Sequence, residues 1–483
     1  MSYFFSPKIK TSLNQTPSNR IAYLAVFVTL GLFLISIVYQ EVVLFLLIYG
    51  GLLIFFLSLL HFELVCLLIP LVIANPINLR DTGTNLIISE YVLLILFFSY
   101  FIRIILYPEK YIFSKKIIIP AVIIIITSIL SLTKAQYIKE GSLQVVRLIE
   151  VLLVFSFLII NVFTTEKSIR RMFFAIIVSG FIASIVGISQ FVIESAITGE
   201  SRRVFGFLGG GYGAIVSSVL ICCVGILLYE RKSMVRIFAY IIAPIAGIAL
   251  IVSQTRAWIG AFVLVLFVML LLLNRKYLIR VLITMGLIIL FIGVFFLTDG
   301  FGLFDGKFFL DAIITSFRFG KNVGEYSIID LSLLMRIVVW TYSIGLFLAN
   351  PLLGLGIGNL RFGNYLPTTL SAPVQGAGYV DNQYIMVFVE TGIIGGFAWL
   401  WLYYNAIKLG TKVLSLPIES NLKSVSFGLF GSLCIFIVGG VFWTITTYHE
   451  LFVWMILIVS LLMCINRITY NSSGGKIEMA KLQ

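Results

Sequence analysis

The chain has 483 residues, of which 60% are hydrophobic and only 11% are charged. This composition excludes an ordinary soluble globular protein and predicts an all-α, polytopic membrane protein. The formal net charge is +13, because 34 Lys and Arg residues outnumber 21 Asp and Glu residues. The cations are spread over short polar segments between apolar runs, as membrane topology requires, so we expect no nucleic-acid partner.

Apolar runs follow one another along almost the whole chain. A transmembrane helix needs about 20 residues, so the sequence predicts a bundle of about 12 to 14 spans. The polar segment 1–20 does not have the pattern of a cleaved signal peptide. The runs 62–74 and 117–132 are short for a complete crossing. The candidate spans are 21–39, 42–60, 62–74, 86–106, 117–132, 143–163, 171–193, 212–229, 235–252, 257–273, 279–297, 383–406, 425–446 and 451–466.

The distribution of basic residues orients these spans. With the N-terminus in the cytoplasm, each inner segment after the turn at His61 carries at least three cations. This asymmetry predicts that both termini are cytoplasmic. The predicted parts are a cytoplasmic tail 1–20, a transmembrane bundle 21–297, an extracytoplasmic loop 298–382, C-terminal helices 383–466 and a cytoplasmic tail 467–483.

A polar segment on the predicted outer face carries Arg202, Arg203 and the glycines 209–211. The glycines lack a preceding strand and a following Lys-Ser/Thr, which excludes a nucleotide-binding loop. Arg202 and Arg203 are candidates to bind phosphate or sugar, and contact with lipid headgroups is an equally good interpretation.

Arg256 lies in a polar break, 253–258, between two long apolar runs. An ionisable residue at such a position is a functional candidate, since membrane proteins keep charge where it is paired, hydrated or used. The alternative is that Arg256 is an interface anchor whose long side chain reaches the membrane surface.

The loop 298–382 is far longer than an ordinary connection, and loops of this length are usually functional or disordered. Residues 331–349 have the periodicity of a helix, with Arg336 and Trp340 one turn apart on one side. This helix is apolar enough to lie in the membrane interface or to pack on the bundle. Asn350-Pro351 ends it, and glycines at every second position from 354 to 358 precede Arg361.

Motifs between residues 203 and 395 resemble those of the bacterial O-antigen ligase and O-antigen polymerase superfamily. The motifs are NPLLGLGIGN at 350–359, DNQY at 381–384 and ETGIIG at 390–395, with RVFGFLG at 203–209 and TRAW at 255–258. The resemblance covers roughly residues 143–405. It implies a glycosyltransferase of the bacterial cytoplasmic (inner) membrane, acting on its outer face.

The resemblance also implies the substrates: a polyprenyl-pyrophosphate-linked oligosaccharide as donor and a glycan as acceptor, among membrane lipids. A flippase and a chain-length regulator are possible partners. No cofactor or metal is expected. Arg256 and Arg336 correspond to the family's functional arginines, and guanidinium groups suit the charge that develops on a departing pyrophosphate. Their alternative roles are an interface anchor and a loop salt bridge.

Asp381 is where the sequence departs from part of the family, because ligases typically carry a histidine before the asparagine. A carboxylate can still accept a proton from an attacking sugar hydroxyl. Asp381 could equally cap a helix that begins near Gln383, and both roles could coexist. His449, on the predicted outer face beside Glu450, is the second-choice base.

Glu390 lies nine residues after Asp381, on the opposite side of the predicted helix and roughly 13 Å farther along it. We expect it to be a buried partner for backbone groups or for an arginine such as Arg256. The residues assigned to substrate binding are Arg202, Arg203, Trp340, Arg361, Asn382, Glu390 and His449, beside the catalytic set Arg256, Arg336 and Asp381.

The expected function is polymerisation of lipid-linked repeat units into a surface polysaccharide. One alternative is a ligase that transfers a finished glycan to a lipid or protein. A flippase or other transporter is a second alternative. Transporters usually place charges near the membrane midplane within repeated halves, whereas the charges here lie outward and no inverted repeat is evident.

Overall fold

The computed structural model describes residues 42–75, 88–106, 114–198, 211–271, 279, 286, 321–323, 326–328, 331–362, 380–416 and 418–472. Within this part, ten helices are long and apolar enough to cross a membrane, and two shorter apolar helices cover 256–271 and 336–349. The prediction of a polytopic helical membrane bundle is therefore confirmed. The candidate spans 21–39 and 279–297 lie outside the described residues, apart from positions 279 and 286.

The chain divides into two compact units, of which the first contains residues 1–69 and 78–109. In this unit α2 (Val42–Cys66) packs against α4 (Ile88–Leu106). The backbone of α2 leaves the helical conformation at His61, with φ −134° and ψ 61°. The candidate span 62–74 is wrong as a single helix, since α2 continues to Cys66 and α3 (Leu68–Ala74) begins after a turn at Leu67.

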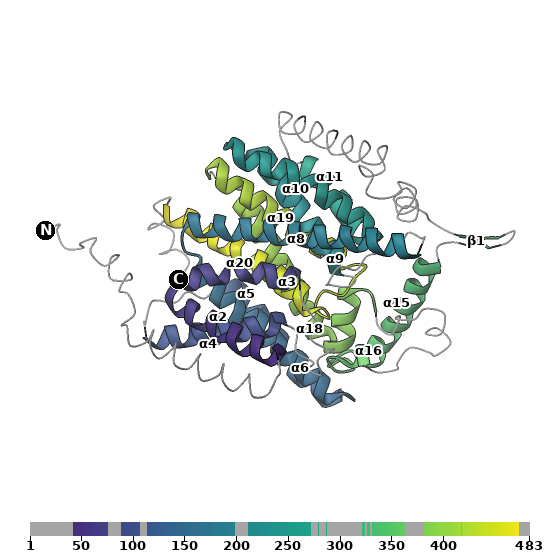
Figure 1. The fold of residues 1–483 in the computed structure, drawn as a ribbon. Helices are drawn as coiled ribbons and strands as arrows, with labels where there is room; N and C mark the ends of the chain where they lie inside the picture. Colours follow the sequence, from purple (N-terminus) through teal and green to yellow (C-terminus); the bar gives the residue numbers. More distant parts are fainter. Residues whose placement is uncertain are drawn as a thin grey trace. The chain divides into compact units, whose positions relative to one another are not determined.

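The second unit contains residues 70–77 and 110–483, and all the motifs belong to it. Figure 1 shows its helices in chain order. They are α5 (Lys115–Ser131), η4 (Leu132–Lys134), α6 (Ile138–Ile149), η5 (Glu150–Phe155), α7 (Ser156–Val162), α8 (Glu166–Thr198), α9 (Tyr212–Tyr229), α10 (Ser233–Val252), α11 (Arg256–Leu271), α15 (Leu331–Ala349), α16 (Asn359–Phe362), α18 (Gln383–Ser415), α19 (Ser420–Gly439) and α20 (His449–Ser472). A short antiparallel pair, β1 (Lys321–Val323) and β2 (Tyr326–Ile328), precedes α15.

Helix α9 is the centre of this unit, because every residue from Tyr212 to Leu228 is buried. It packs against α19, α10, α8 and α11. Glycines permit α9 and α19 to cross closely: a Cβ on Gly225 would lie 2.7 Å from the Ser424 carbonyl oxygen, and one on Gly428 would lie 2.8 Å from the Cys222 Cα. Small residues at such crossings let membrane helices approach until their backbones touch.

Several helices begin or end at other residues than the predicted spans. The candidate span 425–446 ends early, because α19 stops at Gly439 and residues 440–448 form a series of turns. The candidate span 143–163 begins earlier, at Ile138, and α6 continues through the π-helical η5 into α7. The helix predicted over 331–349 is confirmed as α15 with the same bounds.

Candidate functional site

The first residues of α18 hold an ion pair and a helix cap side by side. Arg336 Nη2 lies 3.8 Å from Asp381 Oδ2, and the Asp381 side chain is 31% exposed. The Asn382 side chain accepts a hydrogen bond of 3.0 Å from the Ile385 N–H and is the N-cap of α18. The N-cap of α18 is therefore Asn382 and not Asp381, because the Asn382 side chain supplies the Ile385 N–H with an acceptor.

Gln383, the next residue, is fully buried and fastens a turn to α18. Its Oε1 accepts hydrogen bonds from Ile445 N and Thr446 N at 2.8 and 3.0 Å, and its own N–H donates to the Gly440 carbonyl at 2.8 Å. The following residue, Tyr384, donates its hydroxyl to the Ile437 carbonyl. The segment between α19 and α20 is thus held against the start of α18.

The ion pair with Asp381 does not use every hydrogen-bond donor of Arg336. A separation of 3.8 Å is an ion pair but is too long for a hydrogen bond. The buried Nε of Arg336 has no hydrogen-bond partner among the described residues. The indole N–H of Trp340, one turn later, also has no hydrogen-bond partner among the described residues. The centre of the Trp340 ring lies 6.0 Å from the centre of the Phe442 ring. This face of α15 therefore offers two unused donors beside one carboxylate.

The glycine-rich segment 350–358 packs into a break in α18. Gly392 has φ 72°, so the helical ladder is interrupted and the carbonyl groups before it are released. Leu355 N donates to the Val389 carbonyl at 2.8 Å, and Gly356 N donates to the Glu390 carbonyl at 3.1 Å. A Cβ on Gly392 would lie 2.1 Å from the Leu352 carbonyl oxygen, so only glycine fits.

Glu390 and Asn359 extend this attachment to neighbouring elements. The Glu390 side chain is buried and its Oε1 accepts a hydrogen bond of 3.1 Å from Gly358 N. Its expected backbone partner is therefore found, whereas a pairing with Arg256 stays a prediction. The Asn359 Oδ1 accepts from Gln136 N and Tyr137 N at 3.0 and 3.1 Å, which ties the glycine segment to the start of α6.

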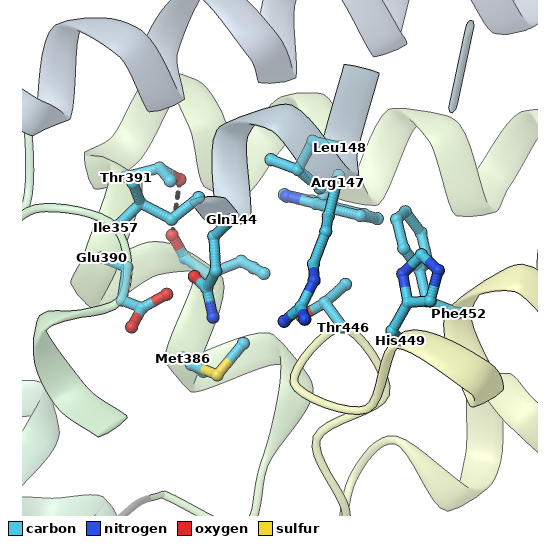
Figure 2. A pocket seen from close by; sticks show the side chains of 12 residues that line it. Gln144, Arg147, Leu148, Ile357, Met386, Glu390, Thr391, Thr446, His449 and Phe452 are labelled. Carbon is cyan, nitrogen blue, oxygen red and sulfur yellow. Dashed lines mark hydrogen bonds between the residues drawn. The ribbon is translucent and has the colours of Figure 1, made fainter. Parts of the chain in front are cut away.

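A cavity lined by residues of α6, α18 and the start of α20 has an empty volume of about 440 Å³, including the open space at its mouth. Figure 2 shows the Arg147 guanidinium and the Gln144 amide reaching into it from α6, with Glu390 on one side and His449 on the other. His449 is only 3% exposed, and neither ring nitrogen has a hydrogen-bond partner among the described residues. Thr446, which is bonded to Gln383, also lines this cavity.

Arg147 and Gln144 were missed in the sequence. The signal was present, because Arg147 lies inside the candidate span 143–163, where a charge is costly and therefore informative. Within the described residues, no group of three His, Cys, Asp or Glu side chains is arranged to hold a metal ion.

Arg256 is the first residue of α11 and is partly buried. The chain turns sharply before it, with Gln254 at φ 47°. Two residues later, the fully buried Trp258 is enclosed by Gly213 of α9 and Gly439 of α19, and its ring lies 5.9 Å from that of Phe436. This tryptophan fixes the end of α11 that carries Arg256.

Arg202 and Arg203 lie outside the described residues, as does the side chain of Arg361 in α16.

Residues 241–400 match the family model described as O-antigen ligase. The resemblance to the O-antigen ligase and polymerase superfamily is confirmed. The matched range contains Arg256, Arg336, Asp381 and Glu390, and it supports a membrane glycosyltransferase of the O-antigen ligase or polymerase type. Arg147 and His449 lie outside this range. The comparison with curated proteins gave no match.

Proposed function

We propose that the protein polymerises polyprenyl-pyrophosphate-linked oligosaccharide repeat units on the outer face of the bacterial cytoplasmic membrane. The observation that carries this proposal is the Arg336–Asp381 pair, in which a cation whose Nε has no hydrogen-bond partner among the described residues faces a partly exposed carboxylate. Transfer of a glycan from a lipid pyrophosphate needs both groups, an acceptor for a hydroxyl proton and donors for a departing anion.

The reaction assigns one role to each of these groups. A terminal sugar hydroxyl of one lipid-linked unit attacks the anomeric carbon of another, and its proton passes to Asp381. The bond between the anomeric carbon and the pyrophosphate oxygen breaks, and the polyprenyl pyrophosphate leaves with the electron pair. The guanidinium of Arg336 loses little by turning from a loose ion pair at 3.8 Å to the phosphate oxygens.

Arg256 is proposed as the second pyrophosphate ligand. Two features support this role: the side chain stands at the start of α11, and the buried Trp258 holds that helix end in place. A fixed guanidinium costs little reorganisation when charge develops on the leaving group. Trp340 lies one turn after Arg336 in α15, and Asn382 follows Asp381 directly before α18; both are proposed to border the substrate.

The proposal favours a polymerase over a ligase because Asp381 stands where ligases typically carry histidine. Transfer to a lipid core or a protein is the alternative within the same chemistry. Transport of the lipid-linked glycan fits less well, since the glycine segment is hydrogen-bonded on two sides, to α18 and to the start of α6. A moving gate would have to break these bonds.

The decisive experiment supplies a defined polyprenyl-pyrophosphate repeat unit to the purified protein in nanodiscs, without ATP. Polymer ladders together with released polyprenyl pyrophosphate are expected. Transfer only to an added lipid or protein acceptor would identify a ligase, and movement of the substrate across a bilayer without glycosyl transfer would identify a transporter. A flippase and a chain-length regulator are proposed partners, because the substrate must first reach the outer face.

The proposed orientation places both termini in the cytoplasm and residues 298–382 outside. Single cysteines at Ser327, beside α15, and Ser415, at the end of α18, test this arrangement. An impermeant thiol reagent should label Ser327→Cys in intact cells and should leave Ser415→Cys unlabelled. The reverse pattern would contradict the orientation, and labelling after membrane disruption controls for reagent access.

A further inference from the structure

An apolar crevice lies between α5, the η5–α7 segment and α20, away from the residues proposed for catalysis. Its empty volume is about 520 Å³, including open space. The walls are almost entirely hydrocarbon, with two serine hydroxyls among them. The lining residues include Ser114, Val122, Leu153, Ser156, Ile160 and Met463.

A local irregularity shapes one wall of the crevice. Residues Glu150–Phe155 form a π-helical stretch, which contributes Leu153, and Ser156 directly follows it. A π-helical insertion changes the direction of side chains after it and is frequent at functional sites. The π-helical stretch thus borders the crevice, whereas α9 at the centre of the bundle is buried from Tyr212 to Leu228.

Cations stand at the end of α5 where the crevice begins. Lys115 and Lys116 are exposed and follow Ser114, a lining residue. On α20, Arg467 lies one turn beyond the lining residue Met463, and its Nη1 donates to the carbonyl of Ile160 at 3.4 Å, another lining residue. The next acidic residue in the chain after the lining residue Ile160 is Glu166, the first residue of α8.

We propose that this crevice binds one anionic phospholipid, with an acyl chain between α5 and α7 and the phosphate near Lys115 and Arg467. An apolar crevice flanked by basic side chains complements a lipid that has a hydrocarbon chain and a negative headgroup. Lys115 is the first residue of α5 and Ser131 is its last. Ser131 accepts a hydrogen bond from Ile357 N of the glycine segment. The lipid is therefore bound at the far end of a helix that contacts the proposed site.

The test measures binding to the purified full-length protein by native mass spectrometry, with dioleoyl-phosphatidylglycerol as the probe and the zwitterionic, net-neutral dioleoyl-phosphatidylcholine as its competitor. Val122→Trp is expected to fill the crevice and abolish retention of the anionic lipid. Ile126→Trp, one turn along the same helix and 50% exposed, is the matched control and should retain it.

The headgroup contacts are tested by charge removal. The double variant Lys115→Gln/Arg467→Gln should bind phosphatidylglycerol about tenfold or more weakly, given the attraction of each basic residue for an anionic surface. The control Arg231→Gln/Lys232→Gln removes two exposed cations before α10 and should change binding less than about twofold. Equal retention of both lipids, or equal losses in the crevice and control variants, would overturn the proposal.

Discussion

Asp381 and His449 both stand at the start of a C-terminal helix, yet their surroundings differ completely. The Asp381 carboxylate is 31% exposed and faces a guanidinium at 3.8 Å. The His449 imidazole is 3% exposed, has no hydrogen-bond partner among the described residues, and lines the cavity bordered by α6, α18 and the start of α20. A base must reach a substrate hydroxyl, so access separates two candidates that sequence position alone leaves similar.

The largest expected effect comes from Asp381→Asn. Because Asn382 caps α18, the substitution removes a proton acceptor and leaves the cap in place. Polymerisation should fall by roughly 10²–10⁴-fold, the usual contribution of a general base. The measurement is the rate of conversion of a defined repeat unit in nanodiscs, with thermal unfolding recorded for the same sample.

The control for that variant is Asn382→Ala, which removes the cap and keeps the carboxylate. It should lower stability by about 1 kcal/mol and reduce activity far less than Asp381→Asn. Full activity of Asp381→Asn would end the base assignment and turn attention to His449.

Arg336→Lys should have the next largest effect. Lysine keeps the charge but loses the planar fork that contacts two phosphate oxygens together. We expect kcat to fall roughly 10²-fold, as when one preorganised donor is removed from a transition-state site. Arg256→Lys should behave alike. Normal polymer length and rate from correctly inserted lysine variants would show that these arginines are anchors.

The break in α18 provides a third prediction. Gly392→Ala places a methyl group against the Leu352 carbonyl and forces φ 72° on a residue with a side chain. Such strain costs on the order of 1–3 kcal/mol, and displacement of the glycine segment should reduce activity about tenfold or more by misplacing Asp381 and Arg336. Gly345→Ala, in α15 with no atom within 4 Å of the added methyl, is the matched control and should be active and equally stable.

The architecture could be predicted from the sequence because a lipid environment leaves long apolar runs few structures other than a membrane-spanning helix. Helix α9 has the predicted bounds, 212–229, and α15 has the predicted bounds, 331–349. The break at Gly392 could not be predicted, since the flanking residues have ordinary helical periodicity and the break depends on Leu352, forty residues away. Likewise, only glycine fits at Gly439, the last residue of α19, because a Cβ there would overlap the ring of the distant Trp258.

The site shows the same division between local and distant causes. The start of α18 was predicted because Asp381 and Asn382 precede an apolar run. The choice of cap was not, because Asp and Asn are both favoured at that position, and the structure shows the Asn382 side chain accepting from the Ile385 N–H. The roles of Gln383 and Asn359 also depend on partners, Thr446 and Tyr137, that are distant in the chain.

His449→Gln should have the smallest effect and gives the sharpest test of the opening comparison. Glutamine keeps one donor and one acceptor near the position of the imidazole, so the cavity beside Arg147 remains polar while any proton transfer by residue 449 is lost. If Asp381 is the base, turnover should stay within about tenfold of the wild-type rate, below the usual contribution of a general base. A loss as large as that of Asp381→Asn, with unchanged thermal stability, would instead place the buried histidine on the path of the proton. In that case the cavity lined by Gln144, Arg147 and Glu390 would have to open to substrate during turnover.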